Sequence, residues 1–381
     1  MVDIRKIVIV GPNPYSNLSA PSVYLRKLVS NISNILKDID LHIVTTGIQN
    51  ETIIYDNITI HSIKKSKIPL HILSEIIKRK IVEINPDIIH GITQSFSTPL
   101  VHLKNRYPCL VTVLGIIGKE YKLYTNRILS YIYRATILKM NEYLMLSKIP
   151  NIVVESTYNK RIIKQIYNVN NSKIYVIPDG IDIKYIQQIV PKNLDKDIHA
   201  FFIGNLYPIK GVDLLIRATP IITKSIPDFH LIIAGRGPQE DHLKRLVKEL
   251  NLEKNIKFLG FISDEDKFKY IKSSKVVVVP SRWDFSPIVI YEAMACGKPV
   301  IASDVTNSEI LIDGKTGLLF KSEDVEDLAN KIITLLADPK LRKKMGKRAL
   351  EKVKECDWSK IAERYIEIYK KVIADFHKQK R

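Results

Sequence analysis

Two carboxylate residues, Asp284 and Glu292, are separated by seven residues and follow the apolar run 276–279, which is typical of a buried strand. One carboxylate can accept two hydrogen bonds from a vicinal diol such as that of a ribose. Glu292 is therefore a candidate for binding a ribose, and Asp284 for binding a second polyol. The other interpretation of this segment is a capped surface helix with incidental acids.

The residues between the two acids predict the start of a helix. Ser286 is followed by Pro287, which is the pattern of an N-cap residue with proline at the first helical position, and Gly297 is expected to end the helix. The amide groups and the positive dipole end of such a helix form an anion site suited to a diphosphate. This site would lie at the carboxyl edge of a parallel strand, where open α/β sheets bind ligands.

Short apolar runs alternate with helical periodicity along the whole chain, which predicts an α/β protein with parallel sheets in both halves. We expect strands in the first half at residues 6–11, 41–45, 87–90, 109–114, 151–155 and 173–178. In the second half we expect strands at residues 200–204, 231–235, 256–258, 276–280, 299–303 and 317–320.

The chain of 381 residues exceeds the size of a single core, so two domains are expected. Residues 178–195 are rich in proline, glycine and charge, as in a hinge. We therefore predict an N-terminal domain over residues 1–190 and a C-terminal domain over residues 191–360. The last helix, residues 361–381, is expected to pack back on the first domain.

The segments Pro280-Ser281, Glu292-Ala-Met-Ala and Gly297-Lys-Pro-Val-Ile-Ala-Ser303 resemble the signature of the family 4 retaining glycosyltransferases. This resemblance implies the GT-B fold, in which two doubly wound Rossmann-like domains face a central cleft. It implies that the N-terminal domain binds the acceptor and that the C-terminal domain binds a nucleotide sugar. It also implies that Glu292 holds the nucleotide ribose, that Asp284 binds the donor sugar, and that the amides of residues 286–288 bind sugar and phosphate. The family usually has glutamate where this chain has Asp284, whose side chain is one methylene shorter.

The segment from Gly204 to Gly211 is similar to the phosphate loop of the family, in which an arginine and a lysine embrace the diphosphate. Lys210 matches the lysine, whereas Asn205 stands at the arginine position, and we consider Arg236 as a substitute. The Gly235-Arg-Gly237 turn and the pair Phe261-Ile262 resemble the segments around the nucleotide base. The resemblance thus implies the following donor-binding residues: Gly204, Asn205, Lys210, Gly235, Arg236, Gly237, Phe261, Ile262, Asp284, Ser286, Pro287, Ile288 and Glu292.

The N-terminal half matches the family less fully. The acceptor side is expected to include Ser19, Ala20, His90 and Leu114. The family usually has two glycines in the first loop, where this chain has Ser19 and Ala20, and a histidine where it has Leu114. A histidine that closes a strand, as His90 does, is also commonly structural.

The family implies transfer of a hexose-type sugar from a nucleotide sugar, such as a UDP- or GDP-sugar, with retention of configuration. Lys210, Asp284 and Glu292 are the expected catalytic residues, and neither a metal nor another cofactor is required. The departures at Asn205, Leu114 and Asp284 keep open a catalytically silent nucleotide-sugar-binding subunit. A hydrolase or an epimerase on the same fold is a further alternative.

The charge of the chain favours an anionic partner, because 59 Lys and Arg residues outnumber 40 Asp and Glu residues. The sequence lacks zinc-finger spacing and RNA-binding signatures, so nucleic acid is not expected. The basic, tyrosine-rich segment 122–148 suits either a membrane interface or an internal helix. Three distant cysteines and the lack of a long apolar run predict a cytoplasmic protein, with peripheral contact to the inner face of the cell membrane left open. We expect a glycan or a lipid-linked acceptor.

Overall fold

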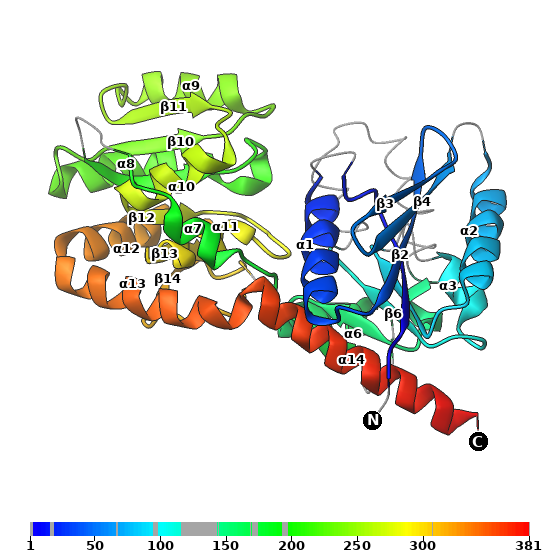
Figure 1. Cartoon of the computed structure of the whole chain (residues 1–381). Helices are drawn as coiled ribbons and strands as arrows, with labels where there is room; N and C mark the ends of the chain where they lie inside the picture. The colour runs from blue at the N-terminus through cyan, green and yellow to red at the C-terminus, as the bar shows by residue number, and fades with distance from the viewer. Residues whose placement is uncertain are drawn as a thin grey trace. The chain divides into compact units, whose positions relative to one another are not determined.

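The computed structural model describes residues 3–15, 19–65, 68–93, 98–115, 143, 145–167, 169, 174–192, 197–306 and 308–380. The chain divides into two compact units (Figure 1). Unit 1 comprises Met1–Gly180 and Trp358–Arg381, and unit 2 comprises Ile181–Asp357. The division after Gly180 lies earlier than the boundary near residue 190 that the sequence suggested.

The sheet of unit 1 has the strand order β3-β4-β2-β1-β5-β6-β7-β8. All neighbouring strands are parallel except β3, which runs antiparallel to β4. The strands are β1 (Lys6–Val10), β2 (Asp40–Gly47), β3 (Glu51–Tyr55), β4 (Ile58–Lys64), β5 (Ile88–Ile92), β6 (Cys109–Thr112), β7 (Ile152–Val154) and β8 (Ile174–Val176). The order reverses next to β1, as in doubly wound sheets.

The hairpin of β3 and β4 was not predicted from the sequence. Its strands meet at Asp56, which has a φ of 51°, so a tight turn replaces the crossover helix that parallel strands require. Most of β3 is exposed. For this reason β3 lacks the continuous apolar run by which the buried strands were recognised.

Helices of unit 1 cover the sheet by means of apolar stripes. They are α1 (Ala20–Ile35), α2 (Leu70–Ile84), α3 (Thr98–Leu103), α6 (Thr157–Tyr167) and α14 (Trp358–Gln379). In α1 the buried positions Tyr24, Leu25, Leu28 and Ile32 recur at helical spacing. They share a core with Trp358, Ile361, Tyr365 and Tyr369 of α14, so the C-terminal helix belongs to this unit.

A buried hydrogen-bond network fixes α14 to the sheet. His90 of β5 lies with its Nδ1 2.6 Å from the Tyr369 hydroxyl and its Nε2 2.7 Å from Oγ1 of Thr112. The Tyr365 hydroxyl lies 2.9 Å from the same Thr112 oxygen and 2.7 Å from the hydroxyl of Tyr24. Because every polar atom named here has a partner, the network can be buried at little cost.

Unit 2 is a doubly wound parallel sheet with the order β11-β10-β9-β12-β13-β14. Its strands are β9 (Ile198–Ile203), β10 (Leu231–Ala234), β11 (Ile256–Gly260), β12 (Ser274–Val279), β13 (Val300–Ser303) and β14 (Gly317–Phe320). Its helices are α7 (Ile183–Gln188), α8 (Val212–Ser225), α9 (Glu240–Glu249), α10 (Asp264–Ser273), α11 (Ile288–Ala295), α12 (Val325–Ala337) and α13 (Pro339–Val353), with 3₁₀ turns η3 (Pro208–Lys210) and η4 (Lys354–Cys356).

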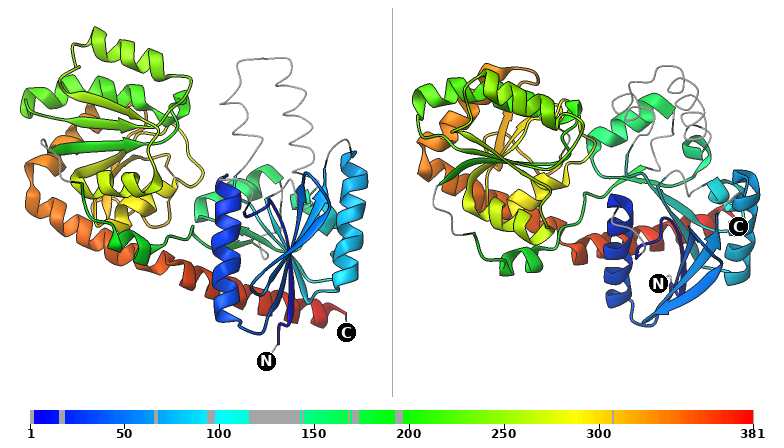
Figure 2. Two further views of the ribbon diagram at one scale, coloured as in Figure 1. Left: turned by 45° about the horizontal axis from the view of Figure 1, so that its top comes forward. Right: turned by 90° about the horizontal axis from the view of Figure 1, so that it is seen from above.

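Alternate residues of the central strand β12 belong to separate cores. Val276 and Val278 join the core under α8, α9 and α12, whereas Val277 and Val279 join the core under α7, α10 and α11. Figure 2 shows helices on both faces of this sheet. Burial on both faces explains the uninterrupted valine run that marked this strand in the sequence.

None of the described helices is long and apolar enough to cross a membrane. The basic, tyrosine-rich segment 122–148 lies almost wholly outside the described residues. Its two sequence-based interpretations therefore stay predictions.

Replacing His90 by glutamine should reduce the loss of stability on acidification. Burial lowers the pKa of His90 to about 3 from an ordinary value of 6.5. Between these values the unfolded chain binds a proton that the folded chain does not, so the free energy of unfolding falls as the pH drops from 6.5 toward 3. His90 should account for about 2 kcal/mol of that fall between pH 7 and pH 5.

Urea denaturation of both proteins at pH 7 and pH 5 measures this difference. His61, whose pKa burial lowers to about 4, contributes equally to both proteins and cancels. An identical pH dependence of wild type and His90→Gln would contradict the assignment.

Candidate active site at the carboxyl edge of unit 2

Two pairs of loops meet at the carboxyl ends of the central strands of unit 2, and glycine permits both contacts. A Cβ atom on Gly235, after β10, would lie 1.9 Å from the carbonyl oxygen of Gly204, after β9. A Cβ atom on Gly211, whose φ is 65°, would lie 2.0 Å from the carbonyl oxygen of Pro280, after β12. Only glycine allows such backbone contact at a positive φ. The two contacts hold the loop of residues 204–211 against the loops that follow β10 and β12.

Lys210 and Asp284 meet across these loops. The Lys210 ammonium, at the end of η3, donates a hydrogen bond to Oδ2 of Asp284 over 2.5 Å. Oδ2 of Asp284 also lies 3.4 Å from the hydroxyl of Ser281, which donates to it. The structure thus brings together two of the three residues predicted to carry chemistry.

The helix predicted after Asp284 is present, but its start differs from the prediction. Pro287, not Ser286, is the N-cap residue, and α11 begins at Ile288 without a side-chain cap. Pro287 has a ψ of 99°, which is extended rather than helical, so Pro287 cannot be the first helical residue. The first amide groups of α11 nevertheless follow Asp284 closely in the chain, in the segment after the carboxyl end of β12. Gly297 has a φ of 68° just past the helix end, as expected.

Glu292 lies on α11 and is buried, with 7% of its surface exposed. Its Oε1 accepts a hydrogen bond from the ammonium of Lys267 over 2.6 Å. Lys267 lies on α10 and also donates to Oδ1 of Asp264 over 2.9 Å. Burial opposes the charged form of Lys267, but the charge and hydrogen bond of Glu292 outweigh it, so the pKa of Lys267 is raised. A carboxylate held by a lysine in this way can still accept hydrogen bonds from hydroxyl groups.

Neither Lys267 nor Arg282 was predicted from the sequence as a residue of the site. The guanidinium of Arg282 forms a bidentate ion pair with Asp213, with both N–O distances at 2.7 Å. Burial disfavours the charged form of Asp213, but hydrogen bonds and charge from Arg282 outweigh it, so the pKa of Asp213 is lowered. Both pairs join residues far apart in the chain. The only local signal was that Lys267 follows the acidic first turn of α10. This pattern does not indicate which residue the lysine contacts.

The other expected donor residues surround this site at the ends of neighbouring strands. Asn205 is exposed after β9, and Arg236 is exposed after β10. The Arg236 guanidinium lies beside Gly260, at the end of β11. Because β11 and β12 lie on opposite sides of β10 and β9 in the sheet, Arg236 is directed away from β12, the strand that precedes Asp284. We therefore find no support for Arg236 as a substitute for the arginine replaced by Asn205.

Phe261 and Ile262 follow β11, and 78% of the surface of Phe261 is exposed. Gly237 stands against the backbone of Leu206, where a Cβ atom would lie 2.5 Å from the Leu206 carbonyl oxygen. The loops after β9, β10, β11 and β12 therefore all contribute expected residues to one edge of the sheet.

Family models match both halves of the chain. Residues 184–352 match the model described as "Glycosyl transferases group 1", and residues 22–185 match "Glycosyltransferase Family 4". An uncharacterised glycosyltransferase of Methanocaldococcus jannaschii is 31% identical over 356 residues, which are 89% of this chain and 94% of that protein. The chain belongs to glycosyltransferase family 4. It is an enzyme of the transferase class.

A second relative of this glycosyltransferase has a specific name. The GDP-mannose-dependent monoacylated alpha-(1-6)-phosphatidylinositol monomannoside mannosyltransferase of Corynebacterium glutamicum is 32% identical over 202 residues. This match spans 48% of this chain and 52% of the relative.

Solved structures show that the glycosyltransferase has the GT-B fold. Sucrose-phosphate synthase of Thermosynechococcus elongatus superimposes with a TM-score of 0.80 at 23% identity, over 97% of this chain and all of that chain. HepE of Anabaena in complex with UDP superimposes with a TM-score of 0.71 at 18% identity, over 96% of this chain and 99% of that chain.

The residues expected on the acceptor side all lie in unit 1 of the glycosyltransferase. Ser19 caps α1, because its hydroxyl accepts a hydrogen bond from the amide of Ser22, and Ala20 begins that helix. Leu114 is half-buried and packs against the core of unit 1. His90 is fully buried, and both its ring nitrogens have partners in the network described above. The expectation that His90 contacts the acceptor is therefore wrong, because no atom of its side chain can reach a ligand.

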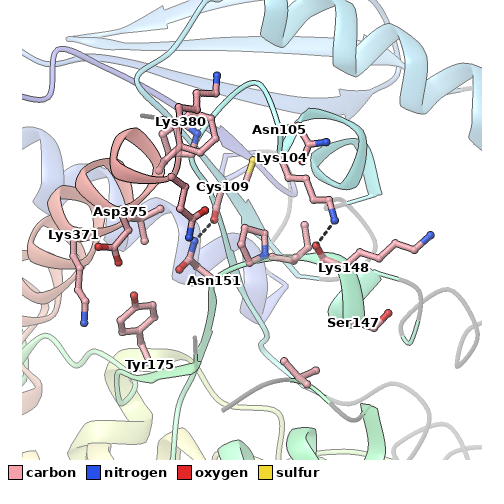
Figure 3. Close-up of a pocket in the computed structure, with 17 residues that line it drawn as sticks. Lys104, Asn105, Cys109, Ser147, Lys148, Asn151, Tyr175, Lys371, Asp375 and Lys380 are labelled. Carbon is pink, nitrogen blue, oxygen red and sulfur yellow. Dashed lines mark hydrogen bonds between the residues drawn. The ribbon is translucent and has the colours of Figure 1, made fainter. Parts of the chain in front are cut away.

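A cavity of about 750 Å³ in unit 1 lies between α14 and the amino ends of β6, β7 and β8, next to Cys109, Asn151 and Tyr175 (Figure 3). Lys104 donates to the carbonyl oxygen of Lys148 over 2.9 Å, and the labelled lysines point in different directions. Doubly wound sheets bind ligands at the opposite, carboxyl edge. This cavity is therefore not a candidate for the substrate site.

Within the part of the chain that the structure describes, no group of three or more His, Cys, Asp or Glu residues could hold a metal ion.

Replacing Lys267 by methionine should destabilise unit 2, because it leaves Glu292 buried without its positive partner. We expect the free energy of unfolding to fall by at least about 2 kcal/mol, since removal of one member of a buried ion pair is costly. Adding Glu292→Gln to this variant should recover most of the loss, since the amide carries no charge. Urea denaturation at pH 7 measures all three proteins.

The matched control is Lys269→Met on the same helix. Lys269 pairs with Glu265, which is exposed, so its loss should change stability little. Equal effects of the two lysine substitutions would contradict a special role of the pair between Lys267 and Glu292.

Proposed function

We propose that this glycosyltransferase transfers a hexose-type sugar from a UDP- or GDP-sugar to a glycan or lipid-linked acceptor, with retention of configuration and without a metal. The proposal rests on the contact of Lys210 with Asp284. In the chain, Asp284 comes shortly before the first amides of α11. This arrangement offers a cation and amide donors for a diphosphate beside a carboxylate for a sugar. Relatives and structural neighbours with UDP or GDP-mannose in their names support a nucleotide-sugar donor.

Each residue of the donor site has a proposed role. Glu292 accepts hydrogen bonds from the two ribose hydroxyls, because its second carboxylate oxygen remains for them when Oε1 holds Lys267. Lys210 and the first-turn amides of α11 bind the diphosphate. Asp284 accepts from a hydroxyl of the transferred sugar. The Lys210 ammonium has three hydrogens, so it can donate to the bound diphosphate and to Asp284 at the same time.

The proposed reaction is a substitution on one face of the sugar. The acceptor oxygen forms the new bond to the anomeric carbon on the face from which the diphosphate leaves, and the carbon–oxygen bond to phosphate breaks. A phosphate oxygen takes the proton of the acceptor hydroxyl. Configuration is retained, and no side-chain nucleophile is needed.

Charge that develops on the departing diphosphate must be stabilised, and preorganised donors supply most of this effect. Lys210 and the amides of α11 would do here what a divalent ion does in metal-dependent transferases. Asp284 keeps the ammonium in place before the donor arrives, so little reorganisation is needed during the reaction.

The acceptor is proposed from charge and from the relatives. The formal charge of +19 favours substrates that bear phosphate or lie on an anionic surface. The Corynebacterium glutamicum relative carries a phosphatidylinositol mannoside in its name. A glycan or lipid-linked acceptor, reached in the cytoplasm or at the inner face of the cell membrane, agrees with both observations.

Donor binding is the first test of this proposal. Calorimetric titration with UDP-glucose, UDP-galactose, UDP-N-acetylglucosamine, GDP-mannose and ADP-glucose should identify one nucleotide sugar that binds with micromolar affinity. Glu292→Gln should weaken this binding at least about tenfold, because the uncharged amide is the poorer acceptor for the ribose hydroxyls. Lack of binding by every member of the panel would count against the donor site and against the silent-subunit alternative as well.

Turnover separates an enzyme with this mechanism from a silent binding subunit. Lys210→Ala should lower kcat by about 100-fold or more, since loss of one preorganised donor costs about 2.7 to 4 kcal/mol. Transfer should be measured as acceptor-dependent release of nucleotide, in the presence of EDTA.

Lys275→Ala is the control. Lys275 lies at the other end of β12, where it forms an ion pair with the exposed Asp197. A strict requirement for a divalent ion would contradict the metal-free mechanism. Donor binding without any acceptor-dependent turnover would favour the silent subunit.

A further inference from the structure

Arg282 lies on the loop that carries Asp284 and contacts the loop that carries Lys210. It follows β12 by three residues, and its backbone N–H donates to the carbonyl oxygen of Ile209 over 2.7 Å. The loop after β12 is thereby joined to the residue directly before Lys210. This backbone bond adds to the contact between Gly211 and the Pro280 carbonyl.

The side chain of Arg282 contacts two further residues, one in the loop that carries Lys210 and one directly after it. Its Nη1 donates to the carbonyl oxygen of Pro208 over 2.7 Å and to Oδ1 of Asp213 over 2.7 Å. Its Nη2 donates to Oδ2 of Asp213 over 2.7 Å. Asp213 lies in the first turn of α8, directly after the loop, so the guanidinium binds the loop on both sides of Lys210.

Such support matters because η3 is only three residues long. A 3₁₀ turn of this length has poor hydrogen-bond geometry and little stability of its own. The place of the Lys210 ammonium therefore depends on contacts from outside the turn. Arg282 supplies three of them from its guanidinium and one from its backbone.

The guanidinium itself is not placed to bind phosphate. Its Nε donates to Oε1 of Glu323 over 2.6 Å, and both Nη atoms are engaged with Asp213. Two carboxylates therefore face the guanidinium and would repel a diphosphate. Arg282 cannot replace the arginine that the family has at the position of Asn205.

We propose that Arg282 is a positioning residue, which through Asp213 and the carbonyl of Pro208 sets where the Lys210 ammonium stands relative to Asp284 and the start of α11. The inference rests on the proposed function, in which Lys210 binds the diphosphate. An arginine fork fits this task because two parallel hydrogen bonds to one carboxylate fix orientation as well as distance.

A double-mutant cycle on nucleotide affinity tests the proposal. UDP, GDP, ADP and TDP are titrated into the wild-type protein by calorimetry, and the nucleotide that binds tightest is used for the cycle. The cycle compares Arg282→Lys, Lys210→Ala and the double variant. Arg282→Lys keeps the charge but cannot make the bidentate contact.

We expect Arg282→Lys to weaken nucleotide binding about tenfold in the wild-type background. In the Lys210→Ala background the same substitution should weaken binding by less than about threefold, because independent effects multiply whereas effects through a shared group do not. Asp213→Asn should reproduce both results. If Arg282→Lys does not fold, the same cycle with Asp213→Asn provides the test.

The results of the cycle distinguish a failure of the positioning role of Arg282 from a failure of the donor site. If the wild-type protein binds a nucleotide and the losses from Arg282→Lys and Lys210→Ala multiply, Arg282 does not act through Lys210, and the proposal is wrong while the donor site stands. If the wild-type protein binds none of the nucleotides, the proposed function fails and the role of Arg282 fails with it. Lys275→Ala is the matched control, because Lys275 lies on β12 at the end opposite to the loop that carries Arg282, and it should leave affinity unchanged.

Discussion

The contact between Gly211 and the carbonyl oxygen of Pro280 constrains everything at the candidate site. Two loops that follow different strands touch backbone to backbone there, and the absence of a Cβ atom makes the contact sterically allowed. Because the loops touch, the Lys210 ammonium reaches Asp284, and the Arg282 backbone reaches Ile209. The ion pairs at the site therefore depend on a backbone geometry that the parallel sheet provides.

Electrostatic pairing is the second common theme of the site. Each of the two acids that dominate the sequence motif has a lysine within hydrogen-bond distance, Lys210 for Asp284 and Lys267 for Glu292. Without these cations, two carboxylates at one sheet edge would oppose the approach of a diphosphate. With them, each carboxylate has a positive partner, which offsets its repulsion of an anionic ligand.

The sequence predicted the parts of the fold that follow from local physics. Buried parallel strands, such as the valine run of β12, appear as apolar runs because both faces are covered. The exposed strand β3 lacks this signal and was missed. Contacts between distant residues were also missed, since Lys267 and Glu292 are 25 positions apart and Arg282 and Asp213 are 69 positions apart. The sequence left His90 open between an acceptor-side and a structural role, because its partner Tyr369 lies on the last helix, which no local pattern connects to β5.

The network of His90, Tyr365 and Tyr369 has a topological consequence. It binds the end of the chain to unit 1, so unit 2 is a continuous insertion within unit 1. The two ends of the insertion are neighbours, because Ile181 donates a backbone hydrogen bond to Cys356 over 2.8 Å and pairs with Asp357. On the unit 1 side, Gly180 stands against the ring of Trp358. An ancestral or engineered exchange of unit 2 therefore needs two junctions at adjacent points, and unit 1 keeps its own core when unit 2 is replaced.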